Sequence, residues 1–390
     1  MQDNEKKPAL RFKGFTDPWE QRKVREVTDR YDNLRIPVAA SLRVAGTTPY
    51  YGANGIQDYV EGYTHDGEFI LVAEDGANDL KNYPVKCVKG RIWVNNHAHV
   101  LQGKCACADN QFLAYAISQA DIESLLVGGG RAKLNAETLM DIELLLPSKD
   151  EQIQIGHYLA RLDHLITLHQ RKYEKLVNIK KSMLDKMFPQ NGASVPEIRF
   201  KGFTDPWEQR KFGEVVDKYE DPVETPHDGY YRLGIRSHAK GTFHSYVEKG
   251  HELETAQMYR VAAGNFIVNI TFGWEHAVAI TNESDAGKLV SHRFPQYSFH
   301  DDMLPEFFKY VIADEDFRHW LWLASPGGAG RNRVLKLDEM LNYEMVLPSK
   351  EEQQRIAAIF RNLDTLITLH QRKLEKLQNI KKSCLEKMLV

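Results

Sequence analysis

The sequence predicts an α+β fold in which two mixed α/β domains are separated by two long antiparallel helices that form a coiled-coil spacer. Two internal repeats predict it. Residues 162–187 recur at 363–388 with few changes, and residues 11–23 recur at 199–211 with none. The segments between these repeats share little sequence. We therefore expect two copies of one framework, each made of a lead-in and a long helix and related by pseudo-two-fold symmetry. Each copy carries a different domain.

Each half begins with a lead-in that contains the sequence Asp-Pro-Trp-Glu, at Asp17 and again at Asp205. Asp is a favoured N-cap residue and Pro is favoured at the first helical position, so we predict a short helix in each lead-in. Trp19 and Trp207 are interpreted as packing anchors.

The variable segments, 24–144 and 212–345, read as mixed α and β. Short apolar runs bounded by turn residues predict strands, and longer periodic runs predict helices. In the first segment the expected elements are a Gly/aromatic loop at 46–55, strands at 69–73, 91–94 and 142–146, a helix at 109–126 and a glycine loop at 128–131. In the second they are strands at 230–235, 265–270 and 277–280, a helix at 305–323 and a glycine loop at 326–333.

The repeated long segments each begin with a capping box, Ser148 to Glu151 and Ser349 to Glu352, and continue with apolar residues at steps of three and four. A helix of roughly 40 residues is about 60 Å long. We predict that the two helices pack antiparallel and either space the domains apart or dock a partner, against the alternative of a hairpin that only fills a core. The docking stripe consists of Ile155, Leu159, Leu162, Ile166, Ile356, Phe360, Leu363 and Ile367.

These repeats set the expected domain boundaries. They are 1–147 for the first domain with its lead-in, 148–188 for the first helix, 189–348 for the second domain with its lead-in, and 349–390 for the second helix.

Charge is segregated along the chain, although the formal net charge is only −3. Residues 171–187 and 372–388 each carry six basic and two acidic residues. Residues 24–144 carry 11 basic and 16 acidic residues, and residues 212–345 carry 13 and 21. Nucleic-acid binding by either domain therefore requires a local basic surface within an acidic whole.

Several functional classes lack their signatures. The four cysteines form no C-x-x-C pair, which argues against a zinc ribbon and fits a reducing cytoplasm. The sequence contains no apolar run that could span a membrane, no P-loop and no nucleophile elbow. His97 and His99 alternate and could share a strand face, but no third metal ligand is evident. We therefore expect no catalytic residue, metal or cofactor on this chain, and a binding role.

The repeated helices and lead-ins, together with the sequence of 50–55 and of 93–99, resemble the specificity (S) subunit of type I restriction-modification enzymes. The resemblance covers essentially the whole chain. It departs from the family at 45–49, where a second Gly is common. The resemblance implies a DNA reader without catalysis, in which each variable domain is a target recognition domain for one half of a split, asymmetric sequence.

The resemblance also implies partners. The helices would fix the unread spacer, at most about 18 base pairs at ~3.4 Å each, and would dock two methyltransferase subunits. Those subunits would supply S-adenosylmethionine chemistry, and restriction subunits would supply ATP hydrolysis. A two-domain coiled-coil scaffold with no role on DNA is the alternative, and an enzyme in its own right ranks third.

Glycine-flanked loops that carry Arg, Asn, His and Tyr suit the edges and phosphates of DNA. The residues expected to bind DNA are Tyr50, Tyr51, Asn54, Asn95, Asn96, His97 and Arg131 in the first domain, and Arg236, His238, Lys240, Thr271, Trp274, His292, Arg293, Arg331 and Arg333 in the second.

Overall fold

The computed structural model describes residues 7–128, 132–190, 192–253, 257–327 and 333–389. It divides into two compact units, the first made of Met1–Lys172 and His370–Val390 and the second of Tyr173–Leu369. Each unit contains one variable domain, its lead-in and part of each long helix. The predicted fold class is confirmed, because both domains are mixed α/β and both long helices form. The predicted domain boundaries stay predictions.

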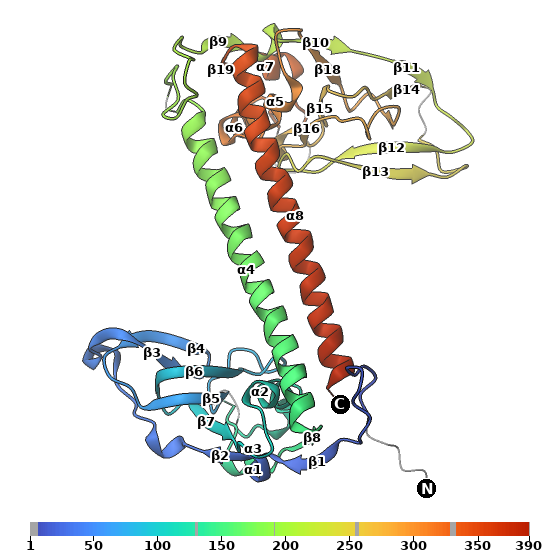
Figure 1. Cartoon of the computed structure of the whole chain (residues 1–390). Helices are drawn as coiled ribbons and strands as arrows, with labels where there is room; N and C mark the ends of the chain where they lie inside the picture. The colour runs from blue at the N-terminus through green and yellow to red at the C-terminus, as the bar shows by residue number, and fades with distance from the viewer. Residues whose placement is uncertain (1–6, 129–131, 191, 254–256, 328–332, 390) are drawn as a thin grey trace. The chain divides into compact units, whose positions relative to one another are not determined.

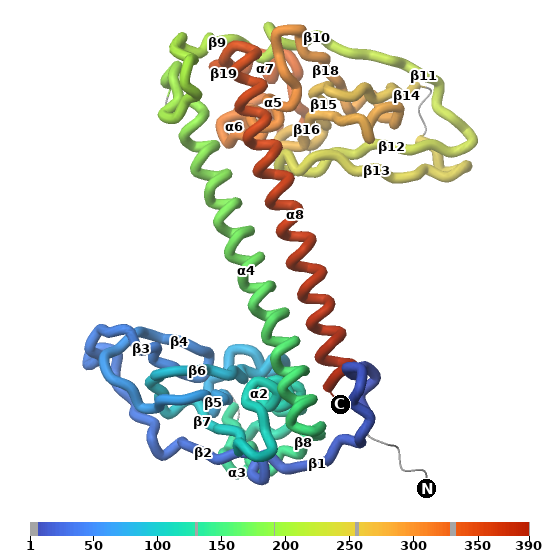
Figure 2. Tube along the Cα trace, in the orientation of Figure 1, coloured from blue at the N-terminus to red at the C-terminus, as the bar shows by residue number. Residues whose placement is uncertain are grey.

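The long helices α4 (Lys149–Met187) and α8 (Lys350–Met388) are each 39 residues long. In the first unit Asp163 of α4 pairs with Lys381 of α8, and His169 contacts His370, so numbers rise along one helix as they fall along the other. In the second unit Lys180 pairs with Asp364. The helices are therefore antiparallel within each unit (Figures 1 and 2).

The lead-ins form strands, and the helices predicted at Asp17 and Asp205 are wrong. Strand β1 (Glu20–Lys23) pairs with β8 (Glu143–Leu146), and β9 (Glu208–Lys211) pairs with β19 (Glu344–Leu347). Each lead-in thus pairs with the end of its own variable domain, and this long-range pairing overrides the local helix-start signal. Both Trp side chains are buried, which confirms that they anchor packing.

The first domain is built on a six-stranded sheet in the order β2-β7-β5-β6-β3-β4. Its strands are β2 (Thr28–Arg30), β3 (Ala45–Gly52), β4 (Gly55–Val60), β5 (His65–Ala73), β6 (Val85–Val94) and β7 (Ala98–Gly103). Only β3 and β6 run parallel. The expected Gly/aromatic loop at 46–55 is instead the hairpin of β3 and β4, because Tyr50 and Tyr51 alternate into a ladder with β4.

The second domain contains a four-stranded sheet, β10-β18-β15-β16, and a five-stranded sheet, β11-β14-β17-β12-β13. The strands of the first of these are β10 (Val216–Tyr219), β15 (Phe266–Val268), β16 (Val278–Ile280) and β18 (Gln296–Phe299). The strands of the second are β11 (Pro222–Glu224), β12 (Tyr230–Ile235), β13 (Thr242–Val247), β14 (Gln257–Arg260) and β17 (Leu289–Val290).

Short helices complete both domains. They are α1 (Val24–Val27), α2 (Asn110–Ser118), α3 (Ala136–Asp141), α5 (Pro305–Val311), α6 (Glu315–Leu323) and α7 (Leu337–Leu341). The single helix expected at 305–323 is two helices, because the Asp314 carboxylate accepts from the Asp316 amide and caps the start of α6. No helix among the described residues is long and apolar enough to cross a membrane.

The apolar stripes of the long helices lie in the chain's own cores. In the first unit α2 packs against α4, as Figure 1 shows, and the core around them also takes in the end of α8. The predicted docking residues Ile155, Leu159, Leu162, Ile356 and Phe360 are buried there or in the core of the second unit, and Ile166, Leu363 and Ile367 are half-buried. The apolar stripe therefore packs the long helices against the variable domains, and its docking of a partner stays a prediction.

Candidate nucleic-acid interface

Three loops of the second domain meet around the segment Ile270–Glu275. The His238 amide donates to the Glu275 carbonyl at 3.0 Å, the Ile270 amide donates to the Arg293 carbonyl at 3.0 Å, and the Leu335 amide donates to the Ile270 carbonyl at 2.9 Å. These backbone bonds gather most of the predicted DNA-binding residues of this domain. We call them the basic loop cluster: Arg236, His238, Lys240, Thr271, Trp274, His292, Arg293 and Arg333.

The basic loop cluster has a local excess of positive charge in a strongly acidic domain. Among the described residues, none of its Arg or Lys side chains forms an ion pair with a carboxylate. The carboxylate of Glu275, which lies beside the cluster, accepts a hydrogen bond from the Ser237 hydroxyl at 2.8 Å. Unpaired cations on a rigid loop frame are suited to phosphate contacts and to the edges of bases.

The turn at 236–241 is held in an unusual backbone conformation. His238 and Ala239 have φ values of 62° and 49°, in the left-handed region that non-glycine residues rarely adopt. Their amides donate to the carbonyls of Glu275 and His276, which holds the turn against the 3-10 helix η5 (Gly273–Glu275). The flanking Arg236 and Lys240 side chains are therefore presented from a fixed turn.

Sequence reasoning missed three exposed aromatic residues on the hairpin of β12 and β13. Tyr231, Phe243 and Tyr246 are 56%, 41% and 55% exposed. The two tyrosine rings make an edge contact at 5.0 Å, and the Arg236 guanidinium lies 5.3 Å from the centre of the Phe243 ring. The available signal was the presence of two aromatic residues, Phe243 and Tyr246, on a strand at the edge of its sheet, although the strand period of two places them on opposite faces.

In the first domain the structure brings the turns at 52–55 and 95–97 and the loop at 74–78 together. The Asn95 amide donates to the Tyr51 carbonyl, and the Asn54 side chain bonds the backbone of Gly76 and Asn78. Tyr50, Tyr51 and Asn95 are 1%, 7% and 3% exposed. These three side chains are buried beneath the loops, and their direct contact with DNA stays a prediction.

Asn96 and His97 remain at the surface of this first loop cluster. Asn96 is exposed, whereas His97 is half-buried with its Nδ1 atom 2.6 Å from the Asp75 carboxylate. His99 is buried and bonds Asp32 and the Leu134 carbonyl, so the two histidines do not share a metal-binding face. Within the described ranges, no three His, Cys, Asp or Glu side chains form a metal-ligand group.

A network of charges lies beneath the first loop cluster. Burial raises the pKa of Asp32, but the hydrogen bonds from His99 and from the Val100 amide outweigh it and leave the pKa below its ordinary value. Glu74 pairs with Arg35 at 2.6 Å and with Lys133 at 2.9 Å. The charges of Asp32, Glu74, Arg35 and Lys133 beneath this loop cluster are thus paired, in contrast to those of the basic loop cluster. Arg131 and Arg331 lie outside the described residues.

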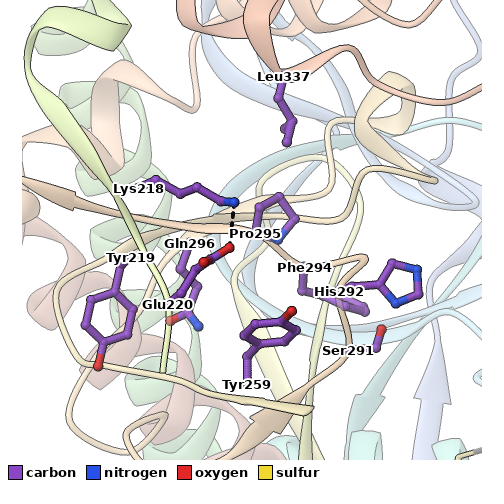
Figure 3. A pocket seen from close by; sticks show the side chains of 10 residues that line it. All are labelled: Lys218, Tyr219, Glu220, Tyr259, Ser291, His292, Phe294, Pro295, Gln296 and Leu337. Carbon is purple, nitrogen blue, oxygen red and sulfur yellow. Dashed lines mark ion pairs between the residues drawn. The ribbon is translucent and has the colours of Figure 1, made fainter. Parts of the chain in front are cut away.

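The second domain also contains a cavity of about 200 Å³ beside His292 (Figure 3). Aromatic and prolyl rings line it, and at one side Lys218 pairs with Glu220 at 2.5 Å. The Gln296 amide in its wall is already bonded to the backbone of Arg260 and Ala262. The cavity is smaller than the roughly 300–1,000 Å³ of typical small-molecule sites, so we assign no cofactor to it.

Comparison with known proteins gives a consistent match. The family model for the type I restriction modification DNA specificity domain matches residues 16–178 and 205–379. A putative type I restriction enzyme specificity subunit of Haemophilus influenzae, S.HindORF215P, is 42% identical over 173 residues, which are 40% of this chain and 45% of that protein. The MjaVIII specificity subunit of Methanocaldococcus jannaschii is 23% identical over 306 residues, 74% of this chain and 71% of that protein.

A solved structure shares the fold. The crystal structure of the type I restriction-modification system S subunit from M. genitalium has a TM-score of 0.66 at 13% identity and covers 98% of this chain and 99% of that chain. At this identity the likeness concerns the fold alone. The match to the Haemophilus protein spans less than half of that protein's length.

Proposed function

This chain belongs to the family of type I restriction-modification DNA specificity domains, and on that premise we propose that it is the sequence-recognition subunit of a type I restriction-modification complex. Each variable domain reads one half of a split, asymmetric double-stranded DNA sequence. The observation that carries the proposal is the basic loop cluster, where unpaired cations gather in a domain that is otherwise acidic.

In this mechanism phosphate contacts position the domain and loop side chains select the bases. Arg293 is the best-placed reader, since it is exposed and its carbonyl is fixed by the Ile270 amide. Phe243 adds flat apolar surface beside Arg236, and Tyr231 and Tyr246 add such surface beside Lys288. In the first domain Asn96 and His97 take the equivalent part, with Asn54, Tyr50 and Tyr51 holding their loops.

Arg293→Ala tests the reading role. We expect the chain, bound to its methyltransferase partner, to lose about 1–3 kcal/mol of binding to its target and to relax at one base position in one half-site. Gel shifts on a library of single-base variants measure this. Arg318→Ala is the matched control, because Arg318 is an exposed arginine of the same domain that pairs with Glu315.

A uniform loss across all sequences, with the salt dependence of binding reduced by about one unit of slope, would assign Arg293 to a phosphate instead. Retardation of every duplex to the same extent by the wild-type complex would contradict sequence recognition. It would favour the scaffold alternative.

We further propose that two methyltransferase subunits dock on exposed leucines of the long helices. Leu165 and Leu168 in the first unit are 38% and 39% exposed, and their repeat equivalents, Leu366 and Leu369 in the second unit, are 43% and 58% exposed. Each unit thus has an exposed apolar patch made of the same two leucines, and two such patches fit two copies of one partner. Restriction subunits then join through the methyltransferases.

The double variant Leu165→Glu/Leu168→Glu should bind one methyltransferase subunit where the wild type binds two, as measured by native mass spectrometry. Leu366→Glu/Leu369→Glu should lose the other. Two bound subunits in both variants would place the docking surface elsewhere.

In this proposal the partner subunits bind S-adenosylmethionine and ATP, and this chain supplies neither methyl transfer nor cleavage. The complex works in the cytoplasm, where the four free cysteines stay reduced. Methyl transfer to DNA by the purified chain with S-adenosylmethionine alone would contradict this division of roles.

A further inference from the structure

Each variable domain is attached to the long helices through a buried glutamine. In the first unit Gln152 of α4 accepts a hydrogen bond at 3.0 Å from the amide of Asp109, the N-cap residue of α2. The Gln152 amide donates to the carbonyls of Pro147 and Cys107, at 2.9 and 3.0 Å. One side chain therefore joins the start of the domain helix to the start of the long helix.

The second unit repeats this contact with different partner residues. Gln353 of α8, the repeat equivalent of Gln152, accepts at 2.9 Å from the amide of Leu304, the N-cap residue of α5. Its amide donates to the Pro348 carbonyl at 2.9 Å. Because the bond is made to a backbone amide, it requires no particular side chain from the domain.

A second attachment point follows on the same domain helix. In the first unit the Tyr115 hydroxyl donates to the Asp163 carboxylate of α4 at 2.6 Å. Lys381 of α8 pairs with the other oxygen of that carboxylate at 2.6 Å, and its ammonium lies 5.5 Å from the centre of the Tyr115 ring. Hydrogen bond, ion pair and cation–π contact form a closed cycle among three helices.

The second unit contains the same cycle. The Tyr310 hydroxyl donates to the Asp364 carboxylate of α8 at 3.0 Å. Lys180 of α4 pairs with that carboxylate at 2.6 Å and lies 5.6 Å from the centre of the Tyr310 ring. The acidic residue now comes from α8 and the lysine from α4, so the two long helices have exchanged roles.

The spacing of the contacts is identical in the two units. Each tyrosine follows the N-cap residue of its helix by six residues, Asp109 to Tyr115 and Leu304 to Tyr310. Each aspartate follows its glutamine by eleven residues along the long helix. Glutamine, aspartate and lysine belong to the repeated segments, whereas each tyrosine belongs to a variable domain. Two domains of different topology thus each present a tyrosine, six residues after a helix N-cap, to the same set of glutamine, aspartate and lysine residues on the long helices. We call each such set a socket.

We propose that these contacts form a common mount, one copy in each unit, that sets the orientation of a variable domain on the long helices independently of the sequence the domain reads. Tyr115 and Tyr310 are positioning residues, and Gln152, Asp163 and Lys381 form the first socket, with Gln353, Asp364 and Lys180 as the second. The two attachment points on each domain helix lie about 9 Å apart along its axis. The lysine from the other long helix fixes rotation about that axis.

The apolar core alone would not set this orientation as sharply. Burial of apolar surface is non-directional, so the contact of α2 with α4 tolerates small rotations. A carboxylate that must meet both a hydroxyl and an ammonium admits few geometries. The consequence for DNA reading rests on the proposed function, because domain orientation then determines how far apart two half-sites must lie.

Tyr115→Phe tests the mount without DNA. Nitroxide labels carried on p-acetylphenylalanine at Lys89, on β6, and at Lys382, on α8, leave the native cysteines intact and lie in one unit. We expect pulsed dipolar spectroscopy to show a distance distribution at least twofold wider in Tyr115→Phe than in the wild type. Tyr310→Phe is the matched control, since it makes the same change in the other unit and should leave this distribution unchanged.

Lys381→Met is a second variant. It keeps the hydrogen bond from the Tyr115 hydroxyl to Asp163 and removes only the contacts that the Lys381 ammonium makes with Asp163 and with the Tyr115 ring. It should broaden the same distribution to a smaller extent. Distributions as narrow as that of the wild type in both Tyr115→Phe and Lys381→Met would overturn the mount. Circular dichroism establishes that each variant is folded before its distances are interpreted.

A DNA arm connects the mount to recognition. In complex with the methyltransferase partner, the wild type should select one spacer length among targets whose half-sites are moved apart by one base pair at a time. Tyr115→Phe should accept neighbouring lengths while it keeps its base selectivity within each half. If the wild type shows no sequence-dependent binding, the proposed function fails, and the label distances still decide the mount. Unchanged spacer selection in Tyr115→Phe would contradict the link to recognition.

Discussion

The first unit builds its variable domain on one six-stranded sheet, whereas the second uses a four-stranded and a five-stranded sheet. The frames beneath them are nearly the same. Arg11 bonds both carboxylate oxygens of Glu151 at 2.8 and 2.6 Å, and Arg199 bonds both of Glu352 at 2.8 Å. The comparison teaches that attachment and reading are separate properties of this chain, one in repeated residues and one in variable ones.

A second difference lies where the domain helices meet the long helices. At Gly156 of α4 an added Cβ would come within 2.8 Å of the Asp109 carboxylate and 2.9 Å of the Phe112 amide. The repeat equivalent in α8 is Ala357, which is buried without such a conflict. The Asp109 side chain caps α2, while α5 starts at Leu304 with no side-chain cap bond. The Asp109 side-chain cap therefore requires glycine at position 156 of α4, whereas the start of α5, which lacks such a cap, is compatible with alanine at position 357 of α8.

Breaking the two lead-in ion pairs should give the largest effect. Glu151→Ala leaves a largely buried guanidinium without its partner, and Glu352→Ala does the same in the second unit, so each should lose about 3–5 kcal/mol of unfolding free energy. Urea denaturation followed by hydrogen exchange assigns each loss to its unit. Glu386→Ala, at an exposed position on α8, should change stability by less than about 0.5 kcal/mol.

Equal losses in the two units would confirm that the frame is energetically duplicated. A loss confined to one unit would show that the two ion pairs, although alike in geometry, contribute differently to the unfolding free energy. It would contradict the view that the two units share one framework.

Exchange of the small residues should give an intermediate and unequal effect. Gly156→Ala should destabilise the first unit by about 1–3 kcal/mol, because the new methyl meets the cap of α2. Ala357→Gly should destabilise the second unit by about 1 kcal/mol through helix propensity. Differential scanning calorimetry measures both. A rise in the melting temperature of Gly156→Ala would mean that α2 shifts to make room.

Acid should have the smallest effect, through the contact of His169 and His370, whose Nδ1 atoms are 2.8 Å apart. Burial lowers the pKa of His169, and the nearby Lys373, His370 and Lys172 lower it further. A folded-state pKa below the unfolded value of about 6.5 means that the folded state binds fewer protons. This contribution to stability is therefore present above about pH 6.5 and is lost as pH falls through the folded pKa.

The measurement is the unfolding free energy between pH 8 and pH 5 for the wild type and for His169→Asn. The variant should show the weaker pH dependence in the first unit. His157→Asn, at an exposed position of the same helix, serves as the control. Parallel curves for the wild type and His169→Asn would remove this histidine from the acid response.

Local patterns predicted the long helices, several strands and the segregation of charge along the chain, because periodicity and composition are properties of the sequence. The same patterns misplaced the lead-ins and the hairpin of β3 and β4. For the lead-in a strand partner distant in sequence, β8 for β1, decided the conformation, and for β3 the ladder with β6 added a distant partner to the adjacent strand β4. Long-range pairing of this kind leaves no signature in a short window.

By itself, then, the sequence determined that one frame occurs twice and carries two unlike domains, since repeats and charge patterns are read directly from residue order. Only the tertiary structure decided which side chains are free to act. It buried Tyr50, Asn95 and the apolar stripes of the long helices. It also brought Tyr115, Asp163 and Lys381 into one contact. The physical reason is that burial and polar contact depend on which elements meet in space, and the loops and helices that meet here are tens to hundreds of residues apart in the chain.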